Sequence, residues 1–275
     1  MSHDFEEGVK RVQQERREAD LVANRARELF ENPIAGKFDA QHLQAVHAYL
    51  FQDTPRHQPG VIREETGGWI KLRALEDKPG VYEVAYLADG VEGRIKSVLD
   101  DFGGPAALRG LSADESARKL ARLYGDLDHA HGFYEGNSRT LREFTRTLAA
   151  EAGFKLDWTG TNVSPDQRNA LYAARDLEVL TRQYPGMTPD TANTPAEYEA
   201  TLQAASFRKT LGEHPLEKII RDSLATGAHH FEPAPAKTAD EYWYRVASKG
   251  TASASHMPDQ SKASINQPYK GPVLE

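Results

Sequence analysis

The feature of the sequence that most constrains its fold is a pair of amphipathic helical patterns, joined by a short polar turn, between residues 112 and 152. Residues 112–115 (Ser-Ala-Asp-Glu) have the form of a capping box, and apolar residues follow at helical spacing from 117 to 127. A second helix is predicted from about Ser138 to Ala152, with Gly153 as its stop. Such a pair predicts a helical core, because each helix must bury an apolar face against another element.

More helical patterns flank this pair, and one stretch changes to the period of a strand. Further helices are expected at residues 4–31, from Asp39 to about Phe51, from Ser164 onward, and near 195–208 and 214–225. Residues 69–74 alternate in polarity, residues 81–87 form a second extended run, and a Glu-Asp-Lys-Pro-Gly turn separates the two. The predicted fold class is therefore mainly α, with one short β-hairpin.

The chain is expected to divide into four segments. These are an N-terminal helical extension (1–36), a core (37–155), helices packed on that core (156–230) and a flexible tail rich in Pro, Ala and Ser (231–275). The mean hydropathy of −0.65 is low for a compact domain, which fits a chain that lies partly outside its core. The aromatic island 242–244 (Tyr-Trp-Tyr) in the tail is either a docking anchor for a partner or, as we favour, a clasp that folds back on the domain.

Charge and cysteine content exclude several classes of function. The 34 basic and 41 acidic residues leave a net charge of −7, so no direct nucleic-acid binding is expected. The absence of cysteine excludes disulfides, zinc ribbons, iron–sulfur clusters and thiol nucleophiles. The N-terminal residues are acidic, and no apolar run is long enough to cross a membrane. We therefore expect a cytoplasmic protein with no membrane partner, or an effector that is translocated into a host cell without a cleaved signal.

The turn between the two central helices, residues 131–142 (His-Gly-Phe-Tyr-Glu-Gly-Asn-Ser-Arg-Thr-Leu-Arg), gathers the groups that can carry chemistry. A helix start offers unpaired N–H groups, and Arg139 and Arg142 lie three residues apart on one face beside it, which suits a polyphosphate. Glu135 adds a carboxylate of the kind that Mg²⁺ prefers. His131 titrates near neutral pH and could deprotonate an attacking hydroxyl group.

Each of these features also has a plainer explanation, since small residues before a helix usually form only a turn and paired arginines are usually solvated. A rival hypothesis takes Asp126, Asp128, His129 and His131 as the metal cluster of a metal-dependent hydrolase. On a helix, however, His129 and His131 would point about 200° apart, so they could share a metal only if the helix has already ended.

Taken whole, the string resembles the signature of the Fic family, His-x-Phe-x-(Asp/Glu)-Gly-Asn-Gly-Arg-x-x-Arg. Every specified position matches except Ser138, where the family usually has Gly. A positive φ at Ser138 would add strain of about 1 kcal/mol. Residues 37–53 are similar to the family's helix before the active site, whereas 58–63 match its Trp-Ala-Gly-x-x-Arg stretch less well. The resemblance implies a Fic-type helical bundle over 37–155 with a short β-hairpin flap.

The resemblance also implies a protein adenylyltransferase that moves AMP from ATP to a Tyr, Ser or Thr hydroxyl of a target protein. His131 would be the general base, Phe133 would anchor the loop in the core, and Glu135 would hold Mg²⁺. The phosphates would be bound by Gly136, Asn137, Ser138, Arg139 and Arg142. UTP or GTP as the donor, and a binding module that has lost the chemistry, remain open alternatives.

The flap, at about 60–72, would hold the target segment by strand pairing. The docking residues that the resemblance implies are Ile62, Arg63, Gly67, Gly68 and Trp69.

The compact form resembles stand-alone bacterial Fic toxins, some of which modify type II topoisomerase subunits, so such a subunit is an implied target. Many Fic proteins carry an inhibitory helix whose Glu pairs with the second arginine of the motif, here Arg142. Residues 2–6 match its (Ser/Thr)-x-x-x-Glu-(Gly/Asn) pattern imperfectly, because Glu7 follows Glu6. We therefore expect inhibition in trans by a small antitoxin, with weak inhibition in cis by residues 2–6 as the rival.

Overall fold

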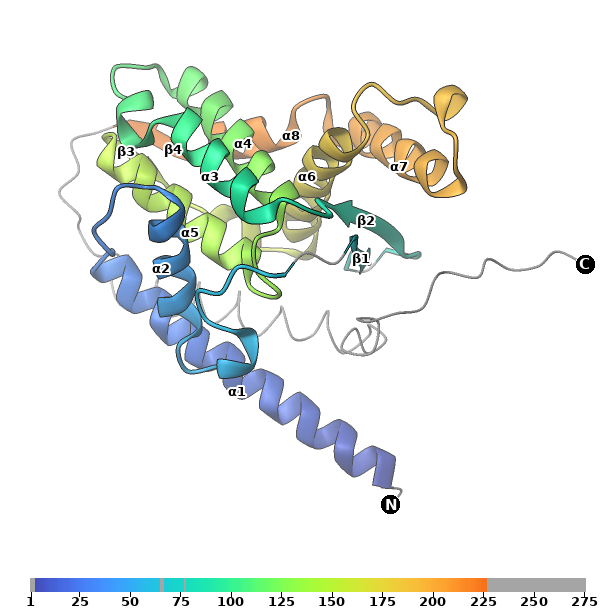
Figure 1. Cartoon of the computed structure of the whole chain (residues 1–275), viewed down its shortest axis with the longest axis horizontal. Helices are drawn as coiled ribbons and strands as arrows, with labels where there is room; N and C mark the ends of the chain where they lie inside the picture. The colour runs from blue at the N-terminus through green and yellow to red at the C-terminus, as the bar shows by residue number, and fades with distance from the viewer. Residues whose placement is uncertain (1–2, 65–66, 77, 227–275) are drawn as a thin grey trace, which may run out of the picture.

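The structure is a computed structural model that describes residues 3–64, 67–76 and 78–226, with side chains described between residues 13 and 225. It is mainly helical, as predicted (Figure 1). Its helices are α1 (His3–Glu31), α2 (Ala40–Phe51), α3 (Val91–Phe102), α4 (Ala113–Ala130), α5 (Asn137–Glu151), α6 (Pro165–Gln183), α7 (Pro195–Leu211) and α8 (Pro215–Asp222). Its strands are β1 (Trp69–Arg73), β2 (Tyr82–Tyr86), β3 (Phe154–Leu156) and β4 (Leu224–Thr226).

Local capping accounts for where several of these helices begin. The Asp39 carboxylate accepts the His42 N–H at the start of α2, and Ser112 and Glu115 form the predicted capping box at the start of α4. The Ser164 hydroxyl caps α6, whose first residue is Pro165. These helix starts confirm the positions predicted from the sequence.

Helix α4 lies at the centre of the bundle. It packs against α3, α5, α6 and α8, while α2 lies on α5 and α1 lies along α2 and α5. Fully buried apolar residues from these helices form the main core, among them Leu50, Phe51, Leu120, Phe144, Leu148, Leu216 and Ile220. The N-terminal part of α1 extends beyond the bundle (Figure 1). The bundle therefore fixes the junction between α4 and α5 from several sides.

The predicted hairpin is present. Strands β1 and β2 pair antiparallel, with Trp69 opposite Tyr86 and Arg73 opposite Tyr82. β2 packs on α6 and α7, so the hairpin rests on helices that follow the central pair in the chain. A second two-stranded sheet pairs β3 with β4 and ties the end of α5 to the chain after α8.

The sequence patterns did not indicate α3, β3 or β4. Helix α3 is preceded by Gly90, which has no side chain to cap it, and contains Gly93, so the usual start signals are weak. Strands β3 and β4 have three residues each, too few to show a period. The expected tail, with its aromatic island, lies outside the described residues.

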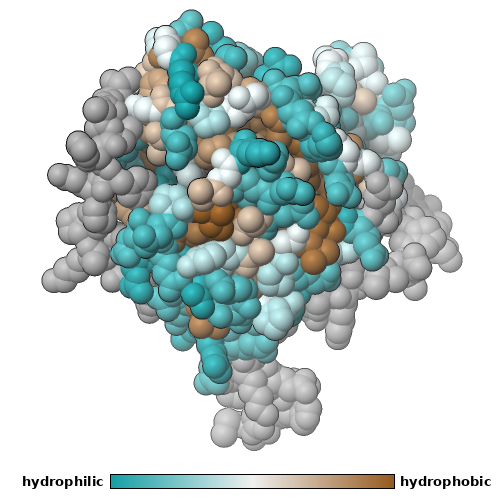
Figure 2. Space-filling model, turned by 60° about the vertical axis from the view of Figure 1, so that its left-hand side comes forward, coloured by the Kyte–Doolittle hydropathy of each residue, from teal (hydrophilic) through white to brown (hydrophobic). Residues whose placement is uncertain are grey.

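Polar side chains cover most of the face shown in Figure 2, with apolar residues visible in small patches between them. Among the described helices, none combines the length and apolar character that a membrane crossing requires.

Candidate active site

The turn that the sequence singled out joins the end of α4 to the start of α5. Helix α4 ends at Ala130, and His131 caps it in the left-handed conformation (φ 48°, ψ 57°), with its N–H bonded to the Leu127 carbonyl at 3.1 Å. A left-handed non-glycine residue carries backbone strain. The chain therefore turns sharply at His131, and the imidazole leaves the axis of the helix.

Asn137 locks the shape of this turn. Its side-chain oxygen accepts the Phe133 N–H at 2.9 Å, and its amide donates to the Phe133 carbonyl at 2.6 Å. The Phe133 ring is buried and stacks on His47 of α2, with ring centroids 3.8 Å apart. Phe133 thus anchors the loop in the core.

His47 is itself fully buried and satisfied at both ring nitrogens. Nε2 donates to the Glu135 carbonyl at 3.0 Å, and Nδ1 accepts the Gly60 N–H at 2.8 Å. Burial lowers the pKa of His47 to about 4, so the ring is neutral and serves as a bridge between α2, the motif turn and the segment before the hairpin.

Gly136 is required at its position for two reasons. Its φ is +82°, and a Cβ atom there would lie 2.1 Å from Cζ of Phe51. Only glycine therefore lets the chain pass so close to α2 before entering α5.

The first hydrogen bond within α5 runs from Thr140 N to the Gly136 carbonyl at 3.0 Å, so the N–H groups of residues 137–139 have no acceptor inside the helix. Ser138 lies within the helix and is not among the residues with positive φ, so it carries none of the backbone strain considered above. The helix start therefore keeps its free N–H groups although Ser138 stands where the Fic signature usually has Gly.

The two arginines of this helix differ in their surroundings. The Arg139 guanidinium lies over the Phe51 ring, 4.8 Å from its centroid, and 3.8 Å from the Glu135 carboxylate. Arg142 is buried, and its Nε donates to the Ser138 carbonyl at 3.3 Å. Both cations belong to the first two turns of α5.

The Glu135 side chain is about half exposed, with Oε1 accepting the Gly136 N–H at 3.0 Å. Desolvation acts to raise its pKa, but the ammonium of Lys71, the guanidinium of Arg139 and the Gly136 N–H together lower it to about 2. Glu135 is consequently an ionised carboxylate at the start of α5.

The His131 ring is only 2% exposed, and neither ring nitrogen has a hydrogen-bond partner among the described residues. Burial, followed by the positive charges of Lys71, Arg73, Arg63 and Arg175, holds the pKa of His131 well below its usual value. The imidazole is therefore neutral at physiological pH, in the form that accepts a proton.

A family model described as Fic/DOC family matches residues 37–149. The chain contains a Fic/DOC domain. The matched span starts where the expected core starts and ends six residues before its expected end at 155, so α6, α7 and α8 follow the Fic/DOC match.

Two curated relatives align with about half of this chain. Protein adenylyltransferase VbhT of Bartonella schoenbuchensis is 33% identical over 144 residues, which cover 52% of this chain and 28% of that protein. A protein adenylyltransferase of Bartonella henselae is 27% identical over 146 residues, which cover 48% of this chain and 25% of that protein. The match thus spans about a quarter of each relative.

Solved structures share the fold over most of the chain. BepC, a VirB-translocated effector of Bartonella tribocorum with bound AMPPNP, superposes with a TM-score of 0.52 at 20% identity, over 81% of this chain and 88% of that chain. The N-terminal Fic domain of a VirB-translocated Bep effector of Bartonella quintana, with bound ADP, gives 0.51 at 23% identity, over 80% and 86%. At these identities the likeness shows a common fold.

The residues expected to form the docking flap of the Fic/DOC domain do not all face outward. Arg63 is a correction: its side chain is buried and donates to the carbonyls of His131 at 2.7 Å, of Ala130 at 3.2 Å and of Leu87. A guanidinium is one of the few groups that can bind several carbonyls at once. Arg63 thus braces the backbone of the His131 turn and is unavailable for contact with a target.

The other four flap residues lie nearer the surface. Gly67 and Gly68 are exposed, and Ile62 is partly buried against the core beside Gly132. Trp69 lies under the Arg63 guanidinium and edge-on to Tyr134, whose hydroxyl accepts the Glu64 N–H at 3.0 Å. Tyr134, at an unspecified position of the motif, therefore links the turn to the flap.

Sequence reasoning missed three hairpin residues that lie near His131: Lys71, Arg73 and Tyr86. Lys71 and Arg73 on β1 supply the first two of the charges that lower the pKa of His131, and the Tyr86 ring on β2 lies 3.9 Å from the His131 ring, measured between centroids. The alternation of Trp69, Lys71 and Arg73 was the available signal, because it places the three side chains on one face of β1.

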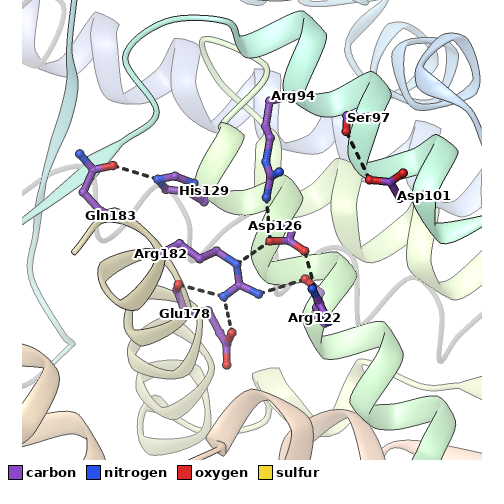
Figure 3. Close-up of polar contacts among 9 residues, drawn as sticks. All are labelled: Arg94, Ser97, Asp101, Arg122, Asp126, His129, Glu178, Arg182 and Gln183. Atoms are coloured by element: carbon purple, nitrogen blue, oxygen red, sulfur yellow. Dashed lines mark hydrogen bonds and ion pairs between the residues drawn. The ribbon is translucent and has the colours of Figure 1, made fainter. Parts of the chain in front are cut away.

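The rival metal cluster is not assembled, which corrects that hypothesis. Asp126 is held by Arg94, Arg122 and Arg182, as Figure 3 shows, and His129 points to Gln183, with Nε2 2.9 Å from its Oε1. Asp128 forms a buried bidentate pair with Arg175. No group of three or more metal-ligating side chains occurs within the part of the chain that the structure describes.

Proposed function

We propose that this domain transfers AMP from ATP to a hydroxyl group of a target protein. The proposal rests on the side chains and backbone groups that the turn between α4 and α5 brings together. Residues 131–142 combine a neutral buried imidazole, an ionised carboxylate and a helix start with two guanidinium groups. Both curated relatives are named protein adenylyltransferase, which supports the same reaction.

His131 acts as the general base. One of its ring nitrogens takes the proton of the target hydroxyl group, whose oxygen attacks the α-phosphorus of ATP. The new bond joins that oxygen to phosphorus, while the bond from the α-phosphorus to the oxygen bridging to the β-phosphate breaks. Pyrophosphate then leaves with that electron pair. The lowered pKa of His131 keeps the ring unprotonated before the reaction, as a base must be.

The start of α5 binds the phosphates. The N–H groups of Asn137 and Ser138 point out of the helix start, and Gly136 lets the nucleotide approach the backbone. Arg139 and Arg142 contact the outer phosphates, because charge-assisted hydrogen bonds to phosphate are the strong ones.

Glu135 fits the Mg²⁺ that this reaction requires. Its carboxylate is ionised, half exposed and fixed beside the helix start by the Gly136 N–H. A single carboxylate together with substrate phosphates is a common way for proteins to hold Mg²⁺. When bound, the ion neutralises charge on the phosphates.

The hairpin docks the target. β1 and β2 form an antiparallel two-stranded sheet, and we propose that a segment of the target is held by strand pairing with this hairpin. Gly67 and Gly68 directly precede β1 and Trp69 begins it, whereas Ile62 lies earlier in the flap and Arg63 acts from the interior.

We also propose that a small antitoxin inhibits the AMP transfer in trans. Among the described residues no carboxylate pairs with Arg142, and we propose that the glutamate of a small antitoxin supplies one. The rival inhibitory segment, residues 2–6, has side chains outside the described set. Deleting residues 1–10 should leave autoadenylylation unchanged, and a large rise would favour inhibition in cis.

The proposed target is a protein, with a type II topoisomerase subunit as the specific candidate. The cysteine-free composition fits a reducing compartment, so we propose action in the cytoplasm of the producing cell, or of a host cell after translocation. Incubating a lysate with α-labelled ATP and identifying the labelled proteins by mass spectrometry tests the target. An unlabelled topoisomerase beside another strongly labelled protein would rule the candidate out.

The reaction itself is tested with a matched pair of histidine variants. His131→Ala should abolish label transfer from α-labelled ATP while the affinity for ATP stays within about threefold, because the base is lost and the phosphate site is not. His129→Ala, two residues away but hydrogen-bonded to Gln183, should retain most of the activity. Retained adenylylation in His131→Ala would contradict the proposal.

A further inference from the structure

The orientation of the His131 ring has no polar explanation within the described residues. Catalytic imidazoles are commonly oriented by a hydrogen bond from one ring nitrogen to a carboxylate or carbonyl. Among the residues that the structure describes, neither nitrogen has such a partner, although the ring is almost completely buried. Arg63 fixes the backbone carbonyl of His131, but the ring itself must be held by packing.

The ring that packs against His131 is Tyr86. The two ring centroids are 3.9 Å apart with the planes inclined at 41°, and Tyr86 is only 1% exposed. Tyr86 belongs to β2, so the side chain that packs on the imidazole comes from the hairpin and not from residues 131–142.

Tyr86 is in turn held from two sides by polar contacts. Its hydroxyl accepts a hydrogen bond from Nη2 of Arg73 on β1 at 2.6 Å. Nε of Arg73 lies 3.6 Å from Oδ1 of Asp176 on α6, and Asp176 is fully buried and also accepts the Tyr82 hydroxyl at 2.7 Å. The chain of contacts runs from α6, beyond the Fic/DOC match, through both strands to the imidazole.

We infer that Tyr86 is a positioning residue for His131, held in place by Arg73 and Asp176. The inference rests on the proposed function and deepens it, because the hairpin that docks the target also sets the position of the base. A target strand added to β1 therefore meets a base whose placement depends on the same hairpin being in position.

The test compares Tyr86→Leu with Tyr86→Phe. The leucine variant removes the ring and should lower kcat about tenfold or more, with KM for ATP changed less than about twofold, because a misplaced base costs rate while the phosphate site is intact. The phenylalanine variant keeps the ring but loses the hydroxyl that accepts the Arg73 hydrogen bond, so it should lose some rate, up to about threefold, and clearly less than the leucine variant. Tyr86→Met is the second variant if the leucine variant does not fold.

Val84→Ala is the matched control, because Val84 is fully buried on the same face of β2 and the substitution leaves both rings in place. It should keep kcat within about twofold. The inference would be overturned if Val84→Ala lost as much rate as Tyr86→Leu, or if Tyr86→Leu retained full kcat.

A readout independent of activity is the Cε1–Hε1 NMR signal of His131. It should broaden in Tyr86→Leu, as the imidazole samples several orientations, and keep close to its wild-type line width in Tyr86→Phe. A wild-type line width in Tyr86→Leu would overturn the inference even if the protein transferred no AMP. A wild-type protein without transfer activity would instead contradict the proposed function.

Discussion

Among single residues, Gly136 is the one whose identity the structure constrains most. Gly136→Ala combines an unfavourable left-handed φ with a Cβ atom 2.1 Å from Phe51, whereas Gly153→Ala has a similar φ, +94°, and open space around the new methyl group. Gly153→Ala should lower the free energy of unfolding by about 1–2 kcal/mol. Gly136→Ala should lower the free energy of unfolding by about 1–3 kcal/mol more, because the added methyl group overpacks the site beside Phe51. Urea denaturation measures both, and equal losses would show that Phe51 moves away freely.

The pH dependence of the rate depends on a second residue, Lys71. Burial is the largest cause of the lowered pKa of His131, and the Lys71 ammonium is the next largest. A lowered pKa means that the neutral base survives to lower pH and that the rate falls as the pH drops through that pKa. Lys71→Met removes a lowering charge, so the acidic limb of the kcat profile should move to higher pH. Lys78→Met, on the exposed turn of the hairpin, is the control and should leave the profile in place.

Prediction from sequence succeeded for residues whose role depends on local contacts. The Asp39 cap, the Ser112 capping box and the turn at Gly136 all involve partners within a few residues or a special φ, which a local pattern can reveal. The interior role of Arg63 and the contact between Tyr86 and His131 join residues 24 to 68 positions apart. Such contacts depend on tertiary packing, and no local pattern encodes them.

Between elements, α6 is the scaffold that joins the hairpin to the end of α4. Arg175 of α6 forms a bidentate pair with Asp128, and both side chains are at most 2% exposed. Arg175→Met should destabilise the protein by about 3–5 kcal/mol, because Asp128 would remain as an uncompensated buried charge.

Arg118→Met is the control for this effect. Arg118 lies on α4, the helix that also carries Asp128, and its two-thirds exposed side chain pairs with Glu217 at 3.7 Å. It should cost about 0–1 kcal/mol. Differential scanning calorimetry compares the two variants, and a loss of the same size in both would show that the buried pair contributes no more than a surface pair.

For the protein as a whole, buried histidines make stability depend on pH. Burial lowers the pKa of His42, His47, His57, His129 and His131 in the folded state. The unfolded chain then binds more protons below about pH 6.5, so stability is lost as the pH falls. For His47, with a folded pKa of about 4, the loss between about pH 7 and pH 5 is about 2 kcal/mol. Urea denaturation at both pH values measures it, and His47→Gln should remove that share of the dependence; an unchanged dependence in the variant would contradict the assignment.

AMP transfer is tested most directly with the purified wild-type chain, Mg²⁺ and ATP labelled in either the α- or the γ-phosphate, with a lysate as the source of target. AMP transfer attaches the α-phosphate to protein and releases the γ-phosphate in pyrophosphate. Relative to the lysate alone, we expect additional protein-bound label from α-labelled ATP, no additional label from γ-labelled ATP, and loss of the additional α-label in His131→Ala. Additional protein-bound label from γ-labelled ATP, or no additional label from either form, would show that the domain does not transfer AMP.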